Sequence, residues 1–333
     1  MTENTTAKVW KQADNKVTVV GLVAENNLEI REFDEWKDGV QTGNKYKAMT
    51  GDLVVRSGEN ENHQIRFFSK QFTNAGAESR QFTGLQTVAD TVVSIADTEK
   101  DAELKPTKVS VQGSMGLNEY MGQDGQLRSF ASIEGRFVNR LDEGDTLEGK
   151  AEYDLEGLVG KVVDEFKGDE ETGRKKVTLL VPLYNSVIPL EFTVDAGEGA
   201  SYIEDNFENG KSVRIYGDIV NFQDVKVVTT PMGFGADKVE EVTTYVRENL
   251  IKGGNLYEED VHPAKIIDAG LVKSKLVERE KHLENLKTRA EQRKQNGNDK
   301  PKTGFGSGMS GQAAKVPNPL DNKGEEINLD GLF

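Results

Sequence analysis

The sequence contains no cysteine, which rules out disulfide bridges and thiolate metal sites. Its three histidines, His63, His262 and His282, lie far apart along the chain, so a histidine-based metal site is not expected. No run of apolar residues approaches the length of a membrane span, and the first residues lack the basic-then-apolar order of a signal peptide. We therefore expect a soluble, cytoplasmic protein with no membrane partner.

Sequence motifs of catalysis are also missing. The chain has no glycine loop of the P-loop type, no GxSxG motif and no HExxH motif. The acidic stretch 164–173 could bind Mg²⁺, but a solvated loop between two strands is the simpler interpretation. We predict a protein that is not an enzyme and that needs no cofactor or metal ion.

The net charge of −15 is distributed unevenly along the 333 residues. Residues 1–150 carry a net charge of −6, residues 151–260 one of −12, and residues 261–333 one of +3. An acidic total counts against non-specific binding of duplex DNA, because that binding depends on cations that neutralise phosphates. It does not exclude a binder of single strands, since stacking of bases on aromatic rings can supply part of the affinity.

Short β-branched and aromatic runs, separated by turn residues, dominate the first part of the chain. They predict five strands, with one helix at 84–96 between the third and the fourth. This is the order of elements in an OB-fold barrel. The predicted strands cover residues 16–25, 51–58, 63–73, 108–117 and 127–141.

A similar order follows in shorter form, which predicts a second small barrel. Strands are expected in 153–166, 174–194 and 211–222, with a short helix at 200–210 before the last of them. Two further helices are predicted at 237–251 and 265–294. The second of these carries 8 basic and 4 acidic side chains between Lys273 and Lys294. We expect it to be a solvated face, with phosphate contacts or self-association as the alternatives.

These patterns predict a mainly β fold: two OB-like small barrels followed by a helical segment and a disordered C-terminal tail. The expected domains are a nucleic-acid-binding barrel at 1–149, an acidic barrel at 150–232 with a scaffold or protein-binding role, a helical segment at 233–295, and a tail at 296–333.

The third predicted strand alternates rings and cations. Because successive side chains of a strand point to opposite faces, Ile65 and Phe67 would share one face. Flat rings on the other face could stack on bases, and cations could bind the phosphates between them. The alternative is that the rings belong to the core, and a single bulge would exchange the two faces. The face assigned to the ligand holds Arg66, Phe68, Lys70 and Phe72.

The fifth predicted strand repeats this arrangement, with Ala131, Ile133 and Phe137 expected to point inward. Its opposite face would carry Arg128, Phe130, Ser132, Glu134, Arg136 and Arg140. Arg80 and Phe82 lie on the connection after the third strand, where a loop could fold over a bound strand. The complete set of predicted nucleic-acid-binding residues is Arg66, Phe68, Lys70, Phe72, Arg80, Phe82, Arg128, Phe130, Arg136 and Arg140.

The stretch from Gly297 onward is rich in Gly, Asn, Pro, Lys and Ser, and it has too little apolar content to fold alone. It ends in GEEINLDGLF, which is acidic and apolar at once. A short tip of this kind on a flexible tether is suited to recruiting a protein, because its ordering entropy is lost only on contact. The predicted partner-binding residues are Glu325, Glu326, Asp330, Leu332 and Phe333.

Taken together, these features resemble a phage-type single-stranded-DNA-binding protein. The resemblance covers the tandem OB-like segments 16–141 and 153–222, the linker 297–324 and the tip EEINLDGLF. It implies coating and protection of single-stranded DNA in replication, recombination and repair, inside a bacterial host, with replication or recombination proteins docking on the tip. A non-enzymatic adaptor that binds other proteins, and a recombination mediator, are the alternatives.

Overall fold

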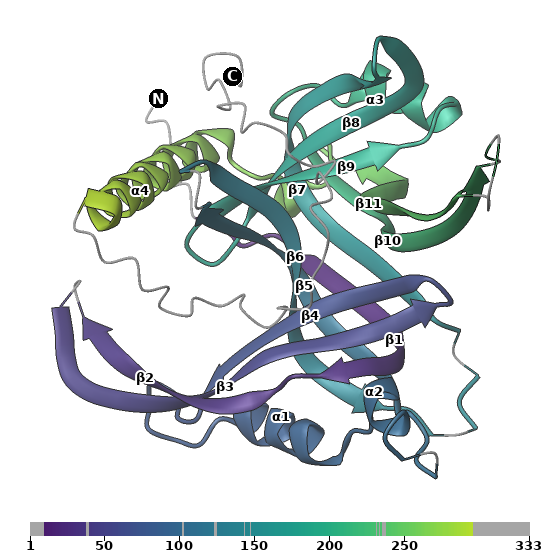
Figure 1. Ribbon diagram of the computed structural model, residues 1–333. Coiled ribbons are helices and arrows are strands. Elements are labelled where there is room, and N and C mark those ends of the chain that lie inside the picture. The colour runs from purple at the N-terminus through teal and green to yellow at the C-terminus, as the bar shows by residue number, and fades with distance from the viewer. Residues whose placement is uncertain are drawn as a thin grey trace.

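The computed structural model describes residues 10–295, except for 38–39, 102, 123–124, 143, 147, 231, 233 and 235–237. The predicted tail and its partner-binding tip lie outside these described residues. Within them, an 11-stranded sheet curls into two barrels (Figure 1). The predicted mainly β fold with OB-like barrels is therefore confirmed.

The first barrel is closed by five strands in the OB order. β1 pairs with β3 and β5, β3 pairs with β4, and β5 pairs with β6. A short parallel contact between β4 and β6, with Ile65 opposite Ile133, closes the circuit. β2 pairs along the outer half of β3, and the two form an arm that projects from the barrel (Figure 1). The strands are β1 (Asn15–Asn26), β2 (Glu29–Lys37), β3 (Val40–Gly58), β4 (Glu61–Lys70), β5 (Lys108–Met121) and β6 (Leu127–Arg140).

The second barrel repeats this circuit. β7 pairs with β8 and β10, β8 pairs with β9, and β10 pairs with β11. A parallel contact between Leu250 on β11 and Thr193 on β9 closes it. The strands are β7 (Lys150–Lys167), β8 (Glu170–Pro182), β9 (Val187–Val194), β10 (Ser212–Thr230) and β11 (Lys238–Leu256).

The prediction of a helix at 237–251 is wrong, because this segment forms β11, the fifth strand of the second barrel. Val239, Val242 and Val246 mimic helical spacing, but Thr243 and Thr244 add to the β-branched content that favours a strand. Long-range pairing decides between the two, since β11 completes a ladder with β10 that runs from Lys238 to Leu256. The helical part of the chain consequently begins after this strand and not at 233.

Three helices lie between strands, and two further helical elements follow the last strand. The predicted helix 84–96 is divided into two, because Ser94 interrupts it and caps the second helix through a capping box with Asp97. The predicted helices at 200–210 and 265–294 are confirmed. The helical elements are α1 (Arg80–Thr91), α2 (Ile95–Thr98), α3 (Glu198–Asn206), the 3₁₀ turn η1 (Pro263–Lys265) and α4 (Ala269–Gln295).

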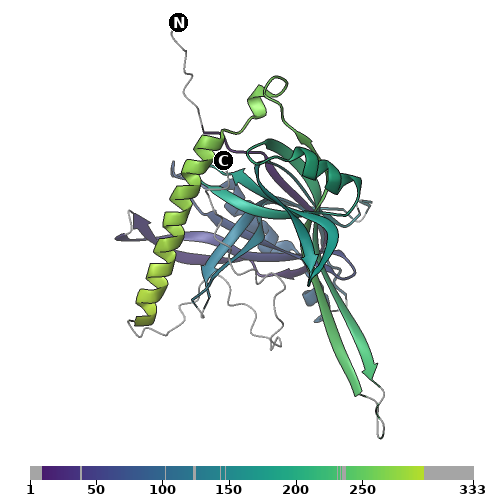
Figure 2. The same cartoon turned by 90° about the horizontal axis from the view of Figure 1, so that it is seen from above.

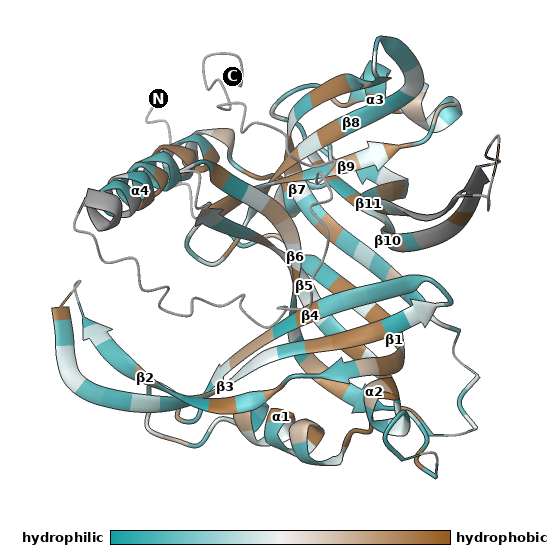
Figure 3. Cartoon of the chain, viewed as in Figure 1, coloured by the Kyte–Doolittle hydropathy of each residue, from teal (hydrophilic) through white to brown (hydrophobic). Residues whose placement is uncertain are grey.

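A continuous apolar core runs through both barrels. It includes Val19 and Phe67 in the first barrel and Leu155 and Phe192 in the second, all of them buried. The barrels are also joined by hydrogen-bonded strands, since β1 pairs with β7 and Phe222 on β10 pairs with Glu61 on β4. Figure 3 shows the apolar colour concentrated on the barrel strands, whereas α4 is mostly hydrophilic. The two barrels are thus held in a fixed relation by shared packing and shared backbone hydrogen bonds.

No helix in the described part of the chain is both long and apolar enough to span a membrane.

Candidate nucleic-acid interface

The side chains of β4 alternate between the core and the surface as the sequence predicts. Ile65 and Phe67 are buried inside the first barrel. On the outer face Arg66 is half-buried, Lys70 is exposed, and Phe68 is 46% exposed. β4 therefore presents a ring between two cations to the outside.

Phe68 belongs to a cluster of rings that spans β2, β3 and β4. Phe33 and Tyr46 are directly opposite each other on β2 and β3, and their rings stack with centroids 5.6 Å apart and planes 22° apart. Phe33 also meets Phe68 edge-on, with centroids 5.8 Å apart. The Nζ atom of Lys70 lies 4.4 Å from the centroid of the Tyr46 ring, which is a cation–π contact. We refer to Phe33, Tyr46, Phe68 and Lys70 as the ring cluster.

Two members of this cluster, Phe33 and Tyr46, are not among the predicted residues. No strand is predicted at 29–37 and the second predicted strand begins at 51, so the sequence pattern does not reveal the arm. A signal was present, because Arg31 and Phe33 on β2 alternate with acidic residues just as Arg66 and Phe68 alternate with apolar ones on β4. The cluster also lies on the face formed by the second and third strands of an OB barrel, where such barrels bind oligonucleotides.

Positive and negative charges are mixed around the ring cluster. On the arm, Arg31 forms an ion pair with Glu29, and Lys45 lies 2.8 Å from Glu32. This hydrogen bond lowers the pKa of Glu32 and raises that of Lys45, so both stay charged. Arg66 is held more loosely, 3.9 Å from its nearest acidic partner on β3. The cations of the arm are therefore partly neutralised, and the rings would have to contribute much of any affinity.

The fifth strand of the barrel, β6, departs from its prediction at a bulge. The ladder with β5 steps from Gln112 opposite Phe137 to Gly113 opposite Gly135, which leaves Arg136 as the extra residue. The bulge turns Phe137 outward, where it is 60% exposed, so its predicted inward position is wrong. Ala131 is likewise exposed, and of the predicted inward set it is Ile133 that is buried.

The other predicted residues of β6 lie on the surface, with a second small group of rings. Phe130 is half-buried and meets Tyr120 on β5 edge-on, with centroids 6.0 Å apart. Arg128, Arg136 and Arg140 are exposed. In the parallel contact with β4, Glu134 lies opposite Arg66, so an acidic residue stands beside the cations of β4.

Of the two residues predicted after the third strand, Phe82 is not accessible to a ligand. Phe82 is 3% exposed and packs in the core beneath α1, so its predicted contact with a ligand is wrong. Its burial follows from the helix, because α1 directs Phe82 inward together with Leu85 and Val88. Phe72, by contrast, lies just beyond β4 and is 54% exposed.

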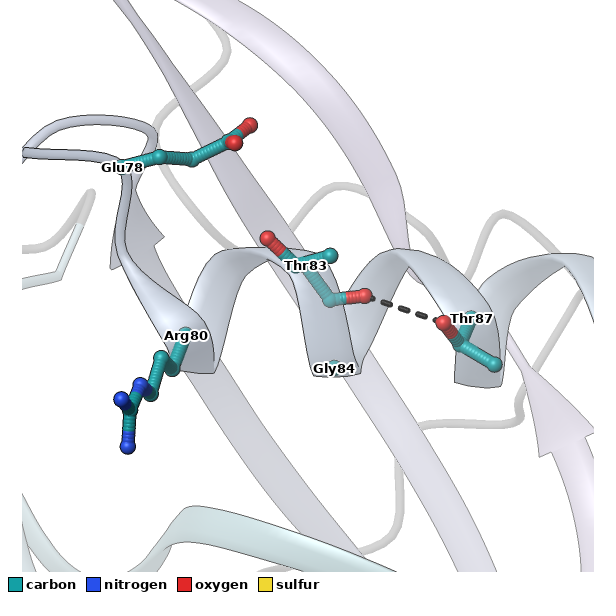
Figure 4. Close-up of a pocket in the computed structure, with 5 residues that line it drawn as sticks. All are labelled: Glu78, Arg80, Thr83, Gly84 and Thr87. Atoms are coloured by element: carbon teal, nitrogen blue, oxygen red, sulfur yellow. Dashed lines mark hydrogen bonds between the residues drawn. The ribbon is translucent and has the colours of Figure 1, made fainter.

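Arg80 is exposed in the first turn of α1, at the rim of a shallow hollow of about 370 Å³ (Figure 4). Thr83, Gly84 and Thr87 also line the hollow, and Glu78 brings an opposite charge to it. Figure 4 shows the Arg80 side chain directed away from the row of threonines. The hollow therefore offers no concentrated charge to a ligand.

The second barrel keeps a row of cations on β8 paired with its own carboxylates. Arg174 lies 3.3 Å from Glu165, 3.0 Å from Asp195 and 2.8 Å from Glu248. Lys175 and Lys176, which follow it on β8, are paired as well. These cations are therefore neutralised by carboxylates of the second barrel itself.

Helix α4 covers part of the outer face of the second barrel. Val272 and Leu276 of α4 pack on Leu158, Leu180 and Val187, which lie on β7, β8 and β9. In the first barrel, by contrast, Phe68 and Lys70 on the outer face of β4 are exposed.

In the residues that the structure describes, no group of three or more His, Asp or Glu side chains is placed to hold a metal ion.

The YorF family model matches residues 13–289, which include both barrels and most of α4. The chain belongs to the YorF family. No curated protein gives a significant match to this YorF-family chain.

Among solved structures, the chain is similar to the single-stranded DNA binding protein from Thermus aquaticus. A deletion mutant of that protein has a TM-score of 0.43 and 15% identity, over 76% of this chain and 98% of that one. The wild-type protein has a TM-score of 0.42 and 13% identity, over 74% of this chain and 95% of that one. A replication protein A heterotrimer bound to ssDNA has a TM-score of 0.19 and 11% identity, over 71% of this chain and 49% of that one. All three similarities are weak.

Proposed function

We propose that this protein binds single-stranded DNA through the outer face of β2, β3 and β4, without catalysing a reaction. The observation that carries the proposal is the ring cluster, in which Phe33, Tyr46 and Phe68 lie beside Lys70 on one exposed face. Rings of this kind accept any base, and cations between them accept the phosphates. A face with both properties is what an unpaired strand requires.

The expected energies favour binding through base stacking more than through charge. Each base stacked on a ring contributes about 1–3 kcal/mol, so two or three bases could provide several kcal/mol. The cations of the arm are partly neutralised by Glu29 and Glu32. We therefore expect a shallow dependence of affinity on salt, and a strong preference for single strands over duplex, whose stacked bases cannot reach the rings.

The direct test is fluorescence anisotropy of a labelled oligo-dT of about 30 nucleotides, long enough for two OB sites at the upper end of their range. The protein is titrated at several salt concentrations, with a duplex of equal length as the control. Tight binding of the single strand with weak binding of the duplex supports the proposal. Failure to bind the single strand even at low salt would contradict it and favour the adaptor function.

We further propose that the bound strand is coated and protected during replication, recombination or repair, and that the C-terminal tip recruits proteins of those processes. The support is the sequence of the tip, where Glu325 and Glu326 precede the apolar pair Leu332 and Phe333. Deleting the last nine residues should leave binding of oligo-dT unchanged or slightly stronger, while capture of host replication proteins is lost. Equal capture by the full-length and truncated proteins would exclude this role for the tip.

A further inference from the structure

The far end of the β5–β6 hairpin is a ribbon of two strands. β1 pairs with β5 only as far as Gly113, and β4 meets β6 only at Ile133 and Glu134. Beyond these contacts, in the described part of the chain, residues 116–121 and 127–132 pair with each other and with no third strand. A two-stranded ribbon is marginally stable on its own in water. The direction of this hairpin end therefore depends on what supports it.

The outer face of the hairpin end carries two rings. Tyr120 on β5 is 44% exposed, Phe130 on β6 is half-buried, and the two rings meet edge-on with centroids 6.0 Å apart. Met115 and Ile133, which are opposite each other on the same ladder, are buried on the inner face. We refer to Tyr120 and Phe130 as the hairpin rings.

Helix α4 supports the inner face of the same hairpin end. Arg279 of α4 forms an ion pair with Glu119 on β5, and the two side chains are only 14% and 16% exposed. The carboxylate of Glu119 also accepts a hydrogen bond of 3.4 Å from the hydroxyl of Ser129, directly opposite on β6. Because Glu119 and Tyr120 are successive residues of a strand, they point to opposite faces. Arg279 therefore holds the hairpin end from the face away from the hairpin rings.

Helix α4 is itself held by the second barrel. Val272 and Leu276 are buried against β7, β8 and β9, and upstream Lys265 lies 2.5 Å from the buried carboxylate of Glu156. Positions 272, 276 and 279 follow the spacing i, i+4, i+7, so they lie on one face of the helix. Figure 2 shows α4 as one long, straight helix. The second barrel thus fixes the place of Arg279, and through it the direction of the hairpin end.

The hairpin rings and the ring cluster lie on the outer face of the same barrel. β4 and β6 run parallel where Ile65 meets Ile133. Phe68 lies three residues beyond this point on β4, and Phe130 lies three residues before it on β6. At about 3.3 Å per residue the two sets of rings are about 20 Å apart along the strands, or about six nucleotides at 3.4 Å each.

We propose that Arg279 is a positioning residue for the binding of single-stranded DNA. It holds the hairpin rings as a second stacking site for the strand whose bases occupy the ring cluster. This inference rests on the proposed function. It gives the second barrel a part in binding without a contact to DNA, because that barrel carries the helix that supports the hairpin.

The test compares a short oligonucleotide, which covers one stacking site, with a long one that reaches both. Binding of oligo-dT of about 4 and about 16 nucleotides, the limits of the range for one OB fold, is measured by anisotropy. In Arg279→Met we expect the dissociation constant of the long oligonucleotide to rise at least about 5-fold, because at least one stacked base is lost. The dissociation constant of the short one should not change. Glu119→Gln breaks the same ion pair from the other side and should behave alike.

The matched control is Lys275→Met, because Lys275 lies on the same helix but forms its ion pair with Glu278 of α4 itself. A second readout tests whether Arg279 acts through the hairpin rings. In the background Tyr120→Ala, Phe130→Ala, adding Arg279→Met should weaken binding of the long oligonucleotide no further. Thermal unfolding is measured first, to establish that each variant is folded.

The outcomes separate this inference from the proposed function. A loss confined to the long oligonucleotide in Arg279→Met, and absent from Lys275→Met, supports it. Equal affinities of these two variants at both lengths would overturn it. A similar loss at both lengths, or a further loss in the background without hairpin rings, would overturn it as well, because the ion pair would then support the barrel as a whole. If the wild type binds neither length, the proposed function itself fails.

Discussion

The ammonium group of Lys70 lies over the ring of Tyr46, 4.4 Å from its centroid. The same ring stacks on Phe33, so Tyr46 is engaged by a cation and by a second ring before any ligand arrives. If a base stacks on the Tyr46 ring as we propose, it must displace the ammonium group of Lys70 from that ring. The displaced group would then be free to bind a phosphate of the same strand.

Replacing Lys70 should therefore change the salt dependence more than the affinity. In Lys70→Met the aliphatic stem is kept and the charge is lost, so we expect the slope of log K against log salt to fall by about 0.7 for oligo-dT. Affinity at high salt should change little, because the rings remain. Lys211→Met, on the second barrel, is the matched control. A slope equal to that of the wild type would show that Lys70 makes no phosphate contact.

Phe67 and Gly135 form a packing pair inside the first barrel. A Cβ atom added at Gly135 would lie 2.3 Å from the ring of Phe67, which is too close for either to remain in place. We expect Gly135→Ala to lower the free energy of unfolding by about 1–3 kcal/mol, as overpacking does. Gly84→Ala is the control, because nothing lies within 4 Å of that position and alanine favours its helix.

A double-mutant cycle tests whether the two residues are coupled. Phe67→Leu makes room for the new methyl group, so the loss in Gly135→Ala, Phe67→Leu should be smaller than the sum of the single losses. Urea unfolding of the four proteins gives the coupling free energy. Strict additivity would contradict the contact.

His63 should make stability depend on pH. Its side chain is 1% exposed, with Nε2 2.9 Å from the hydroxyl of Ser57, and burial lowers its pKa to about 4 from the usual 6.5. The unfolded chain therefore takes up the proton first as pH falls. The contribution of His63 is complete above pH 6.5 and is lost between pH 6.5 and about 4, by up to about 3 kcal/mol.

The comparison of wild type with His63→Gln isolates this effect from the titration of carboxylates. Urea unfolding at pH 5, 6 and 7.5 should show a steeper loss of stability toward low pH in the wild type than in the variant. Parallel curves for the two proteins would mean that His63 is accessible to protons in the folded state.

Arg174 should contribute to the stability of the second barrel and not to the affinity for DNA. Its guanidinium binds Glu165, Asp195 and Glu248, so Arg174→Met leaves three carboxylates without their common partner. We expect a loss of about 1–3 kcal/mol in the free energy of unfolding. At temperatures below its unfolding transition, the variant should bind oligo-dT with the wild-type affinity. A large fall in affinity of the folded variant would place part of the ligand on the second barrel.

The sequence allowed the strand order of the first barrel and the two faces of β4 to be predicted, because both depend on local alternation. Ile65 and Phe67 alternate along β4 with charged and aromatic residues, so a period of two is enough to assign them to the buried face. The second barrel was predicted without its last strand. The identity of β11 depends on pairing with β10, which local spacing does not reveal.

The candidate site was predicted in part for the same reason. The outward positions of Phe68 and Lys70 follow from the alternation on β4. Phe33 and Tyr46 join them only because β2 pairs with β3 and β3 pairs with β4. One extra residue, Arg136, reverses the direction of Phe137, and α1 carries Phe82 into the core. Bulges and helix positions of this kind are set by tertiary packing, so a single sequence gives little sign of them.

The central claim is that exposed rings of the first barrel hold the bases of a single strand. The most direct test compares Phe33→Ala, Phe68→Ala with Tyr184→Ala, Tyr202→Ala, a pair of exposed rings on the second barrel. Binding of oligo-dT is measured for both after thermal unfolding has shown that each is folded. At about 1 kcal/mol or more per ring, the account predicts a dissociation constant at least about 30-fold higher for the first variant and unchanged for the second. Equal dissociation constants for the two folded variants would contradict it.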